Sequence, residues 1–72
     1  MNINKAIQMA FEHHQQGNLK QAEDLYKKIL KVQPNNVDVY NYLGNVLQDK
    51  GDLDEAITRH QKAIELNPTF PS

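Results

Sequence analysis

Histidine is the residue type in this 72-residue chain best suited to metal binding or proton transfer, and three histidines occur. His13 and His14 follow Glu12 directly, whereas His60 lies far along the chain. Neighbouring residues of a helix point about 100° apart, so the pair cannot chelate one ion from a single helix face. No His-Glu-x-x-His motif and no cysteine accompany them. We therefore expect no metal site, with His13 packed near a turn and His14 at the surface.

Nucleophilic and acid–base catalysis find equally little support. The hydroxyl side chains of serine and threonine are Thr58, Thr69 and Ser72, and none lies in a glycine-rich elbow. The three glycines are isolated, so no loop can cradle a phosphate. One group of carboxylates, however, gathers around a turn and a helix start, where capping and the helix dipole explain it better than catalysis. The group consists of Asp49, Asp52, Asp54 and Glu55. The sequence predicts a non-catalytic protein that needs no cofactor.

Composition narrows the classes of partner. Eight Lys and Arg stand against nine Asp and Glu, which gives a formal charge of −1. Nucleic-acid binders and polybasic membrane anchors normally show a strong basic excess, so neither is expected. The basic run of Lys27, Lys28 and Lys31 lacks aromatic stacking partners and is expected to be solvated. The N-terminus has no signal-peptide pattern and no apolar run could span a bilayer, so we expect a soluble, cytoplasmic protein.

Helical periodicity runs through nearly the whole chain. Apolar residues recur at spacings of three and four, which predicts helices over residues 3–16, 19–31, 37–50 and 53–66. Alternation of period two is absent, so an all-α fold without strands follows.

The residues between these segments predict how the helices end and begin. Gly17 and Gly51 can close a helix in the left-handed conformation. Asn18 and Asp52 then follow as candidate N-caps, with Gln21 and Glu55 placed to complete a capping box. Pro34 and Pro68 end the second and fourth helices.

The chain also repeats itself. The stretch 51–68, GDLDEAITRHQKAIELNP, overlays the stretch 17–34, GNLKQAEDLYKKILKVQP. Glycine, leucine, alanine, lysine and proline coincide in the overlay. A period of about 34 residues with two helices per period is typical of a stacked helix–turn–helix array.

The repeat resembles the tetratricopeptide family. The second unit fits that pattern closely with Tyr40, Leu43, Gly44, Leu47, Ala56, Ala63 and Pro68, while His60 stands where an aromatic residue is usual. The first unit fits less well, although Ala22, Tyr26 and Pro34 hold. The resemblance implies one domain over residues 1–72, a short right-handed solenoid of four helices. The first unit would span residues 3–36 and the second would span residues 37–70, with the start of a truncated third unit at residue 71.

Small residues suggest how the helices of a unit cross. Gly44 lies in mid-helix, where glycine costs about 1 kcal/mol relative to alanine, so a close approach of another helix would explain it. Ala56 is the neighbour we expect across the turn, giving a short interaxial distance near the lower end of roughly 8–10 Å.

The resemblance implies a binding surface on the concave face, lined by the first helix of each unit. The expected lining is Asn4, Ile7, Phe11, His14 and Gln15 from the first unit and Asp38, Asn41, Asn45, Gln48 and Asp49 from the second. The six of these expected to bind a peptide are Ile7, Phe11, His14, Asn41, Asn45 and Gln48. The amides suit the backbone of an extended peptide, and Phe11 would be an apolar anchor. Some relatives grip a terminal carboxylate with Lys and Asn, but Ile7, Phe11 and Tyr42 occupy those positions here. A merely solvated polar face remains the alternative.

The last helix predicts a second surface. With no further helix to cover it, it should expose Ile57, His60, Ile64 and Phe70. We interpret His60 as an amphipathic ring packed at a unit boundary, with a pH-sensitive contact as the alternative. Either the chain is an excerpt of a longer protein, or this face binds another copy, which includes exchange of helices between chains. A protein or peptide partner on the concave face is the first expectation, and a homo-oligomer formed through the last helix is the second.

Overall fold

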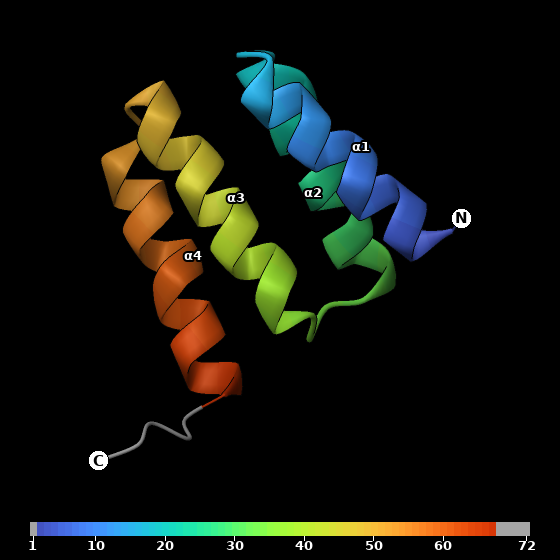
Figure 1. The fold of residues 1–72 in the computed structure, drawn as a ribbon. Helices are drawn as coiled ribbons and strands as arrows, with labels where there is room; N and C mark the ends of the chain where they lie inside the picture. Colours follow the sequence, from blue (N-terminus) through green and yellow to red (C-terminus); the bar gives the residue numbers. More distant parts are fainter. Residues whose placement is uncertain (1, 68–72) are drawn as a thin grey trace.

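The computed structural model describes residues 2–67, which form four helices joined by short turns (Figure 1). They are α1 (Ile3–Gln15), α2 (Leu19–Val32), α3 (Val37–Lys50) and α4 (Leu53–Leu66). Each helix therefore ends within one residue of its predicted bound, and no strand occurs in the described range. None of the four is both long and apolar enough to cross a bilayer.

The helices form two hairpins that lie side by side. α1 packs on α2 and α3 packs on α4, while α2 joins the hairpins by packing against α3. The largest fully buried side chains lie on α2 and α3, namely Tyr26, Ile29, Val39, Leu43, Val46 and Leu47. These residues recur at spacings of three and four, so each helix turns one continuous apolar face into a shared core.

Two of the four helix starts are capped by a side chain, and they are not the two that the sequence predicts. Asn2 Oδ1 accepts from the backbone N–H of Lys5 at 3.1 Å, and Asn36 Oδ1 accepts from that of Val39 at 3.2 Å. The predicted caps Asn18 and Asp52 accept no such bond. Their ψ angles of 66° and 68° lie outside the extended region that aims a side chain at the first turn.

The tight Gly turns account for this difference. Gly17 and Gly51 adopt φ angles of +82° and +90°, as predicted. The next residue enters a helix at once and its side chain turns elsewhere: Asn18 Nδ2 donates to Gln16 Oε1 at 3.4 Å, and Asp52 pairs with Lys50 at 3.2 Å. The expected capping boxes are therefore wrong.

Gly44 does allow a close approach, and the atoms nearest to its Cβ position belong to His60 and not to Ala56. A Cβ at Gly44 would lie 2.6–2.8 Å from three atoms of the His60 ring. The missing side chain of Gly44 thus makes room for the imidazole, so the partly buried His60 packs between α3 and α4. Ala56 is buried, yet it is not the group that requires the glycine.

A buried carboxylate links the two hairpins. Glu23 on α2 is buried, and its two oxygens accept from Lys27 at 2.7 Å and from Lys50 of α3 at 2.6 Å. Lys27 also reaches Glu55 of α4 at 3.4 Å, so the prediction that Lys27 is solvated is wrong. Hydrogen bonds from Lys27 and Lys50 lower the pKa of Glu23 from 4.5 to about 2, against the opposing effect of burial. These three ion pairs connect α2 with α3 and with α4.

Candidate functional site

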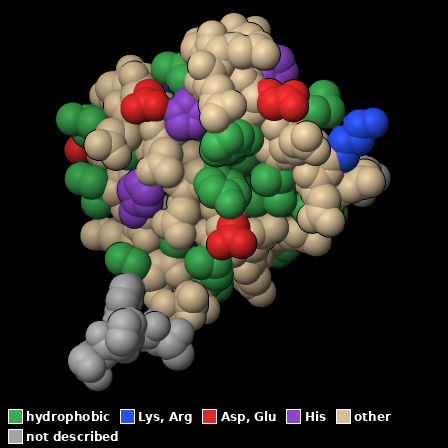
Figure 2. Space-filling view, viewed as in Figure 1, with side chains coloured by type: hydrophobic (Ala, Val, Ile, Leu, Met, Phe, Trp, Pro, Cys, Tyr) green, Lys and Arg blue, Asp and Glu red, His purple; other side chains and the backbone are tan. Residues whose placement is uncertain are grey.

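Three aromatic rings form the floor of a groove between α1 and α3. Phe11 of α1 meets Tyr42 of α3 edge to face, with ring centroids 6.5 Å apart, and Tyr42 lies 5.8 Å from the ring of Tyr26 beneath. Tyr26 is fully buried, whereas Phe11 remains 45% exposed. Figure 2 shows hydrophobic side chains gathered over the middle of α1 and α3, bordered by acidic and histidine side chains. The groove therefore offers an apolar surface that nothing within the described chain covers.

The hydroxyl group of Tyr26 is a polar group within the otherwise apolar floor of the groove. It is buried and has no hydrogen-bond partner among the described residues. Burial, together with Tyr42, raises the pKa of Tyr26 to about 12. An unsatisfied buried hydroxyl costs free energy, so packing of the ring must hold it in place.

A depression of about 500 Å³ opens at one end of the groove, where α1 and α3 begin. Its lining combines apolar side chains, amides and one carboxylate: Asn2, Ile3, Asn4, Ile7, Gln33, Asn36, Asp38 and Tyr42. Amides both donate and accept hydrogen bonds, which suits an extended peptide backbone.

The opposite end of the groove is closed by an ionisable pair. His14 Nε2 of α1 lies 2.5 Å from Asp49 Oδ2 of α3, and the side chain of His14 is only 20% exposed. His14 thus lies at the groove surface, as expected, but its imidazole is partly covered because it bridges the two hairpins. Within residues 2–67 no three histidine, aspartate or glutamate side chains come together as metal ligands would.

Two family models described as tetratricopeptide repeats match residues 6–36 and 25–58. Together they span residues 6–58 of the 72-residue chain, which covers α2 and α3 whole and most of α1. The chain belongs to the tetratricopeptide repeat family. The matches support two repeat units, and repeats of this family generally mediate protein–protein interaction, which is a non-catalytic role.

The six residues expected to bind a peptide on the concave face do not all share one surface. Ile7, Phe11 and His14 line the groove with Tyr42 and Asp49. Asn45 lies seven residues after Asp38 and so shares its side of α3.

Asn41 turns toward α4 instead. Its Oδ1 lies 3.4 Å from His60 Nδ1, and it lines a small depression with Ala63, Ile64 and Asn67. Gln48, seven residues later on α3, lies on the same side as Asn41. The physical reason is that neighbouring helical residues diverge by about 100°, so Asn41 and Tyr42 cannot face the same groove.

Tyr42 is a groove residue that the predicted binding site did not list, although the resemblance puts it with Ile7 and Phe11 at positions where some relatives grip a terminal carboxylate. Asp38 and Asp49 were expected on the same face, and they lie at the two ends of the groove. That Asp38 lies beside Ile7 depends on how the two repeats are stacked.

The repeat symmetry explains the apolar face of α4. Tyr26 and Leu30 of the first repeat are covered by α3, and Leu30 is only 8% exposed. Their counterparts in the second repeat are His60 and Ile64, and Ile64 is 49% exposed. Ile57 is likewise 55% exposed, as predicted. Phe70, the fourth residue assigned to this face, lies outside the described residues.

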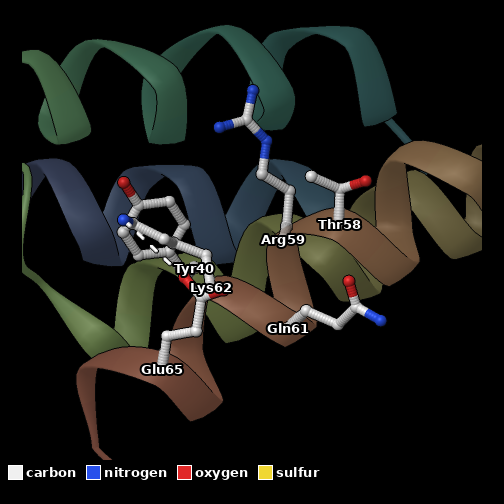
Figure 3. Close-up of a pocket in the computed structure, with 6 residues that line it drawn as sticks. All are labelled: Tyr40, Thr58, Arg59, Gln61, Lys62 and Glu65. Atoms are coloured by element: carbon white, nitrogen blue, oxygen red, sulfur yellow. Dashed lines mark ion pairs between the residues drawn. The ribbon is translucent and has the colours of Figure 1, made fainter.

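The remaining surface of α4 carries a smaller depression of about 230 Å³, lined by Tyr40 and by side chains of α4 (Figure 3). Arg59 extends away from it toward α2 and pairs with Glu55 at 3.3 Å. Lys62 and Glu65 form a loose ion pair of 3.9 Å. Arg59 Nε is buried with no hydrogen-bond partner among the described residues, so not every polar atom here is satisfied. The lining side chains do not converge on a common point in Figure 3, and we assign no chemistry to this depression.

Proposed function

We propose that this tetratricopeptide pair binds a peptide segment of a partner protein along the groove between α1 and α3. The observation that carries the proposal is the ring of Phe11, which remains 45% exposed although it packs against Tyr42. Burying the exposed part of such a side chain contributes about 1 kcal/mol to binding. The amides around the depression would hold the peptide backbone, and Ile7 extends the apolar surface.

Met9 provides a matched control for this proposal. It is 44% exposed on the same helix, but it lies two residues from Phe11 and so about 200° around the helix axis. We expect Phe11→Ala to weaken every peptide that binds the wild-type domain by at least fivefold, and Met9→Ala to leave the affinity unchanged.

The measurement is a titration of the ¹⁵N-labelled domain with an array of decapeptides, followed by amide shift changes. Shifts should concentrate on α1 and α3. Equal effects of the two substitutions, or shifts spread over α2 and α4, would contradict binding in the groove.

A second candidate function is self-association through α4, including exchange of helices between chains. It is favoured by Leu53, Ile57 and Ile64, three large apolar side chains that are exposed along this one helix. Together with His60 they are spaced by four, three and four residues, which forms one continuous stripe.

The two ends of the repeat pair are unlike, which restricts how copies could join. α3 turns the fully buried Val39 and Val46 into the core beside the first repeat. The counterparts on α1, one repeat earlier, are Lys5 and Glu12, and both are exposed. The outer side of α1 is therefore too polar to stack on α4, so association would pair α4 with α4 of a second copy.

Sedimentation equilibrium over a hundredfold range of concentration tests this second function. Ile57→Ser with Ile64→Ser should shift a dimer toward monomer, while Val32→Ser on α2, also an exposed apolar position, should not. A wild-type domain that stays monomeric at millimolar concentration would refute self-association and leave peptide binding untouched.

A further inference from the structure

Charge is distributed unevenly over the molecule, although its net charge is only −1. Of the eight Lys and Arg, four lie on α2 and two on α4, namely Lys20, Lys27, Lys28, Lys31, Arg59 and Lys62. Lys50 of α3 is bound to Glu23 on α2 at 2.6 Å. Lys5 lies two residues before Ile7, so it leaves α1 on the side away from the groove. No cationic side chain of Lys or Arg therefore lines the groove described above.

Acidic side chains, by contrast, stand at both ends of the groove. Asp38 lines the depression beside Ile7 and Tyr42, and it forms no ion pair within residues 2–67. Asp49 stands at the other end, where its only ion-pair partner in the described chain is His14. In Figure 2 the acidic side chains border the central hydrophobic group, and the largest basic group lies at the edge of the view.

We propose that the groove selects a basic peptide, with Lys or Arg side chains placed to reach Asp38 and Asp49 and an apolar residue between them against Phe11. This inference rests on the proposed peptide-binding function and names the class of its partner. The two aspartates are separated along α3 by about 16 Å, at a rise of about 1.5 Å per residue. An extended chain covers that distance in about five residues.

The surroundings of the groove favour this class over an acidic peptide. Asp38 forms no ion pair with Lys or Arg within residues 2–67, so a peptide carboxylate there would meet a like charge. Asp38 lies in the first turn of α3, where the N-terminus of the helix, with about half a positive charge, offsets only part of its negative charge. Asn2 and Asn36 already cap the N-termini of α1 and α3. Phe11 and Tyr42 add aromatic faces on which a cation can rest.

The test compares four hexapeptide probes on the ¹⁵N-labelled domain. The cationic probe is acetyl-Lys-Ser-Leu-Ser-Ser-Lys-amide, and its partners carry Gln or Glu in place of both lysines, or Ser in place of the leucine. We expect the Lys probe to bind at least fivefold more tightly than the Gln probe, and the Glu probe to bind most weakly. Raising the salt concentration should reduce the advantage of the Lys probe.

Variants of the domain test whether the preference for the Lys probe arises in the groove. Asp38→Asn should weaken the Lys probe about two- to fivefold and leave the Gln probe unchanged, as expected for one exposed charge pair. Asp54→Asn is the matched control, because it removes the same charge from an exposed site on α4. Phe11→Ala should weaken the Lys and Gln probes alike.

The possible outcomes distinguish a failure of the selectivity for basic peptides from a failure of peptide binding itself. If the Gln or Glu probe binds as tightly as the Lys probe, and Phe11→Ala weakens it, the groove binds peptides but does not select basic ones. If Asp38→Asn and Asp54→Asn have equal effects on the Lys probe, the attraction is a general charge effect and the inference falls. If no probe binds in a manner that depends on Phe11, peptide binding in the groove fails and the inference fails with it.

Discussion

Acid should loosen the junction between the two repeats by protonating a single side chain, Glu23. The pKa of this carboxyl is lowered from 4.5 to about 2, primarily by hydrogen bonds from Lys27 and Lys50. The folded state therefore binds a proton more weakly than the unfolded chain does. Stability from this group is complete above about pH 4.5 and is lost as the pH falls toward 2.

The size of the loss follows from the two pKa values. Their separation corresponds to at most about 3.4 kcal/mol. Solvent reduces this figure, because the side chains of Lys27 and Lys50 are 38% and 27% exposed. We expect about 1–2 kcal/mol, a substantial share of the roughly 4–11 kcal/mol that stabilises a domain of this size.

Urea unfolding followed by circular dichroism, repeated between pH 7 and pH 2, measures the effect. Glu23→Gln should be less stable than wild type by about 1–2 kcal/mol at pH 7, and the two free energies of unfolding should converge near pH 2. Glu65→Gln, which removes an exposed carboxylate from the loose pair with Lys62, should follow the wild-type curve. A constant difference between wild type and Glu23→Gln at every pH would show that the ion pair is not what holds the junction.

Two further predictions concern the core. Gly44→Ala should destabilise the wild type by about 1–2 kcal/mol, since its Cβ would overlap the His60 ring. In a His60→Ala background it should instead stabilise the helix by up to about 1 kcal/mol, and a urea double-mutant cycle that gives the same sign in both backgrounds would contradict the packing. Tyr26→Phe should be neutral or stabilising by about 1 kcal/mol, because it removes a hydroxyl with no partner among the described residues. The raised pKa of Tyr26, about 12, also predicts that stability falls as the pH rises from 10 to 12, and that Tyr26→Phe loses less over this range. Thermal melting at pH 8 and pH 11 checks both statements about Tyr26, and a marked loss of stability in Tyr26→Phe at pH 8 would be evidence against them.

The sequence predicted several residues of the candidate site, but it did not predict which way every side chain faces. Phe11 and Ile7 stood out because apolar side chains at otherwise exposed helical positions need a partner, and the structure places both in the groove. Asn41 and Gln48 were assigned to the same face, but one step of about 100° around α3 sends them toward α4. His14 resembled a surface residue until the second repeat brought Asp49 within 2.5 Å of it.

The sequence by itself determined the four helices, their ends and their pairing, since periodicity, the two Gly turns and the internal repeat are local signals. Only the tertiary structure decided which residues from different repeats meet. Burial of Glu23 between two lysines, the contact of His60 with Gly44, and the assembly of Phe11, Tyr42 and Tyr26 all depend on how the helices pack on one another. The packing angles are set by many side-chain volumes acting together, so no single spacing in the chain records them.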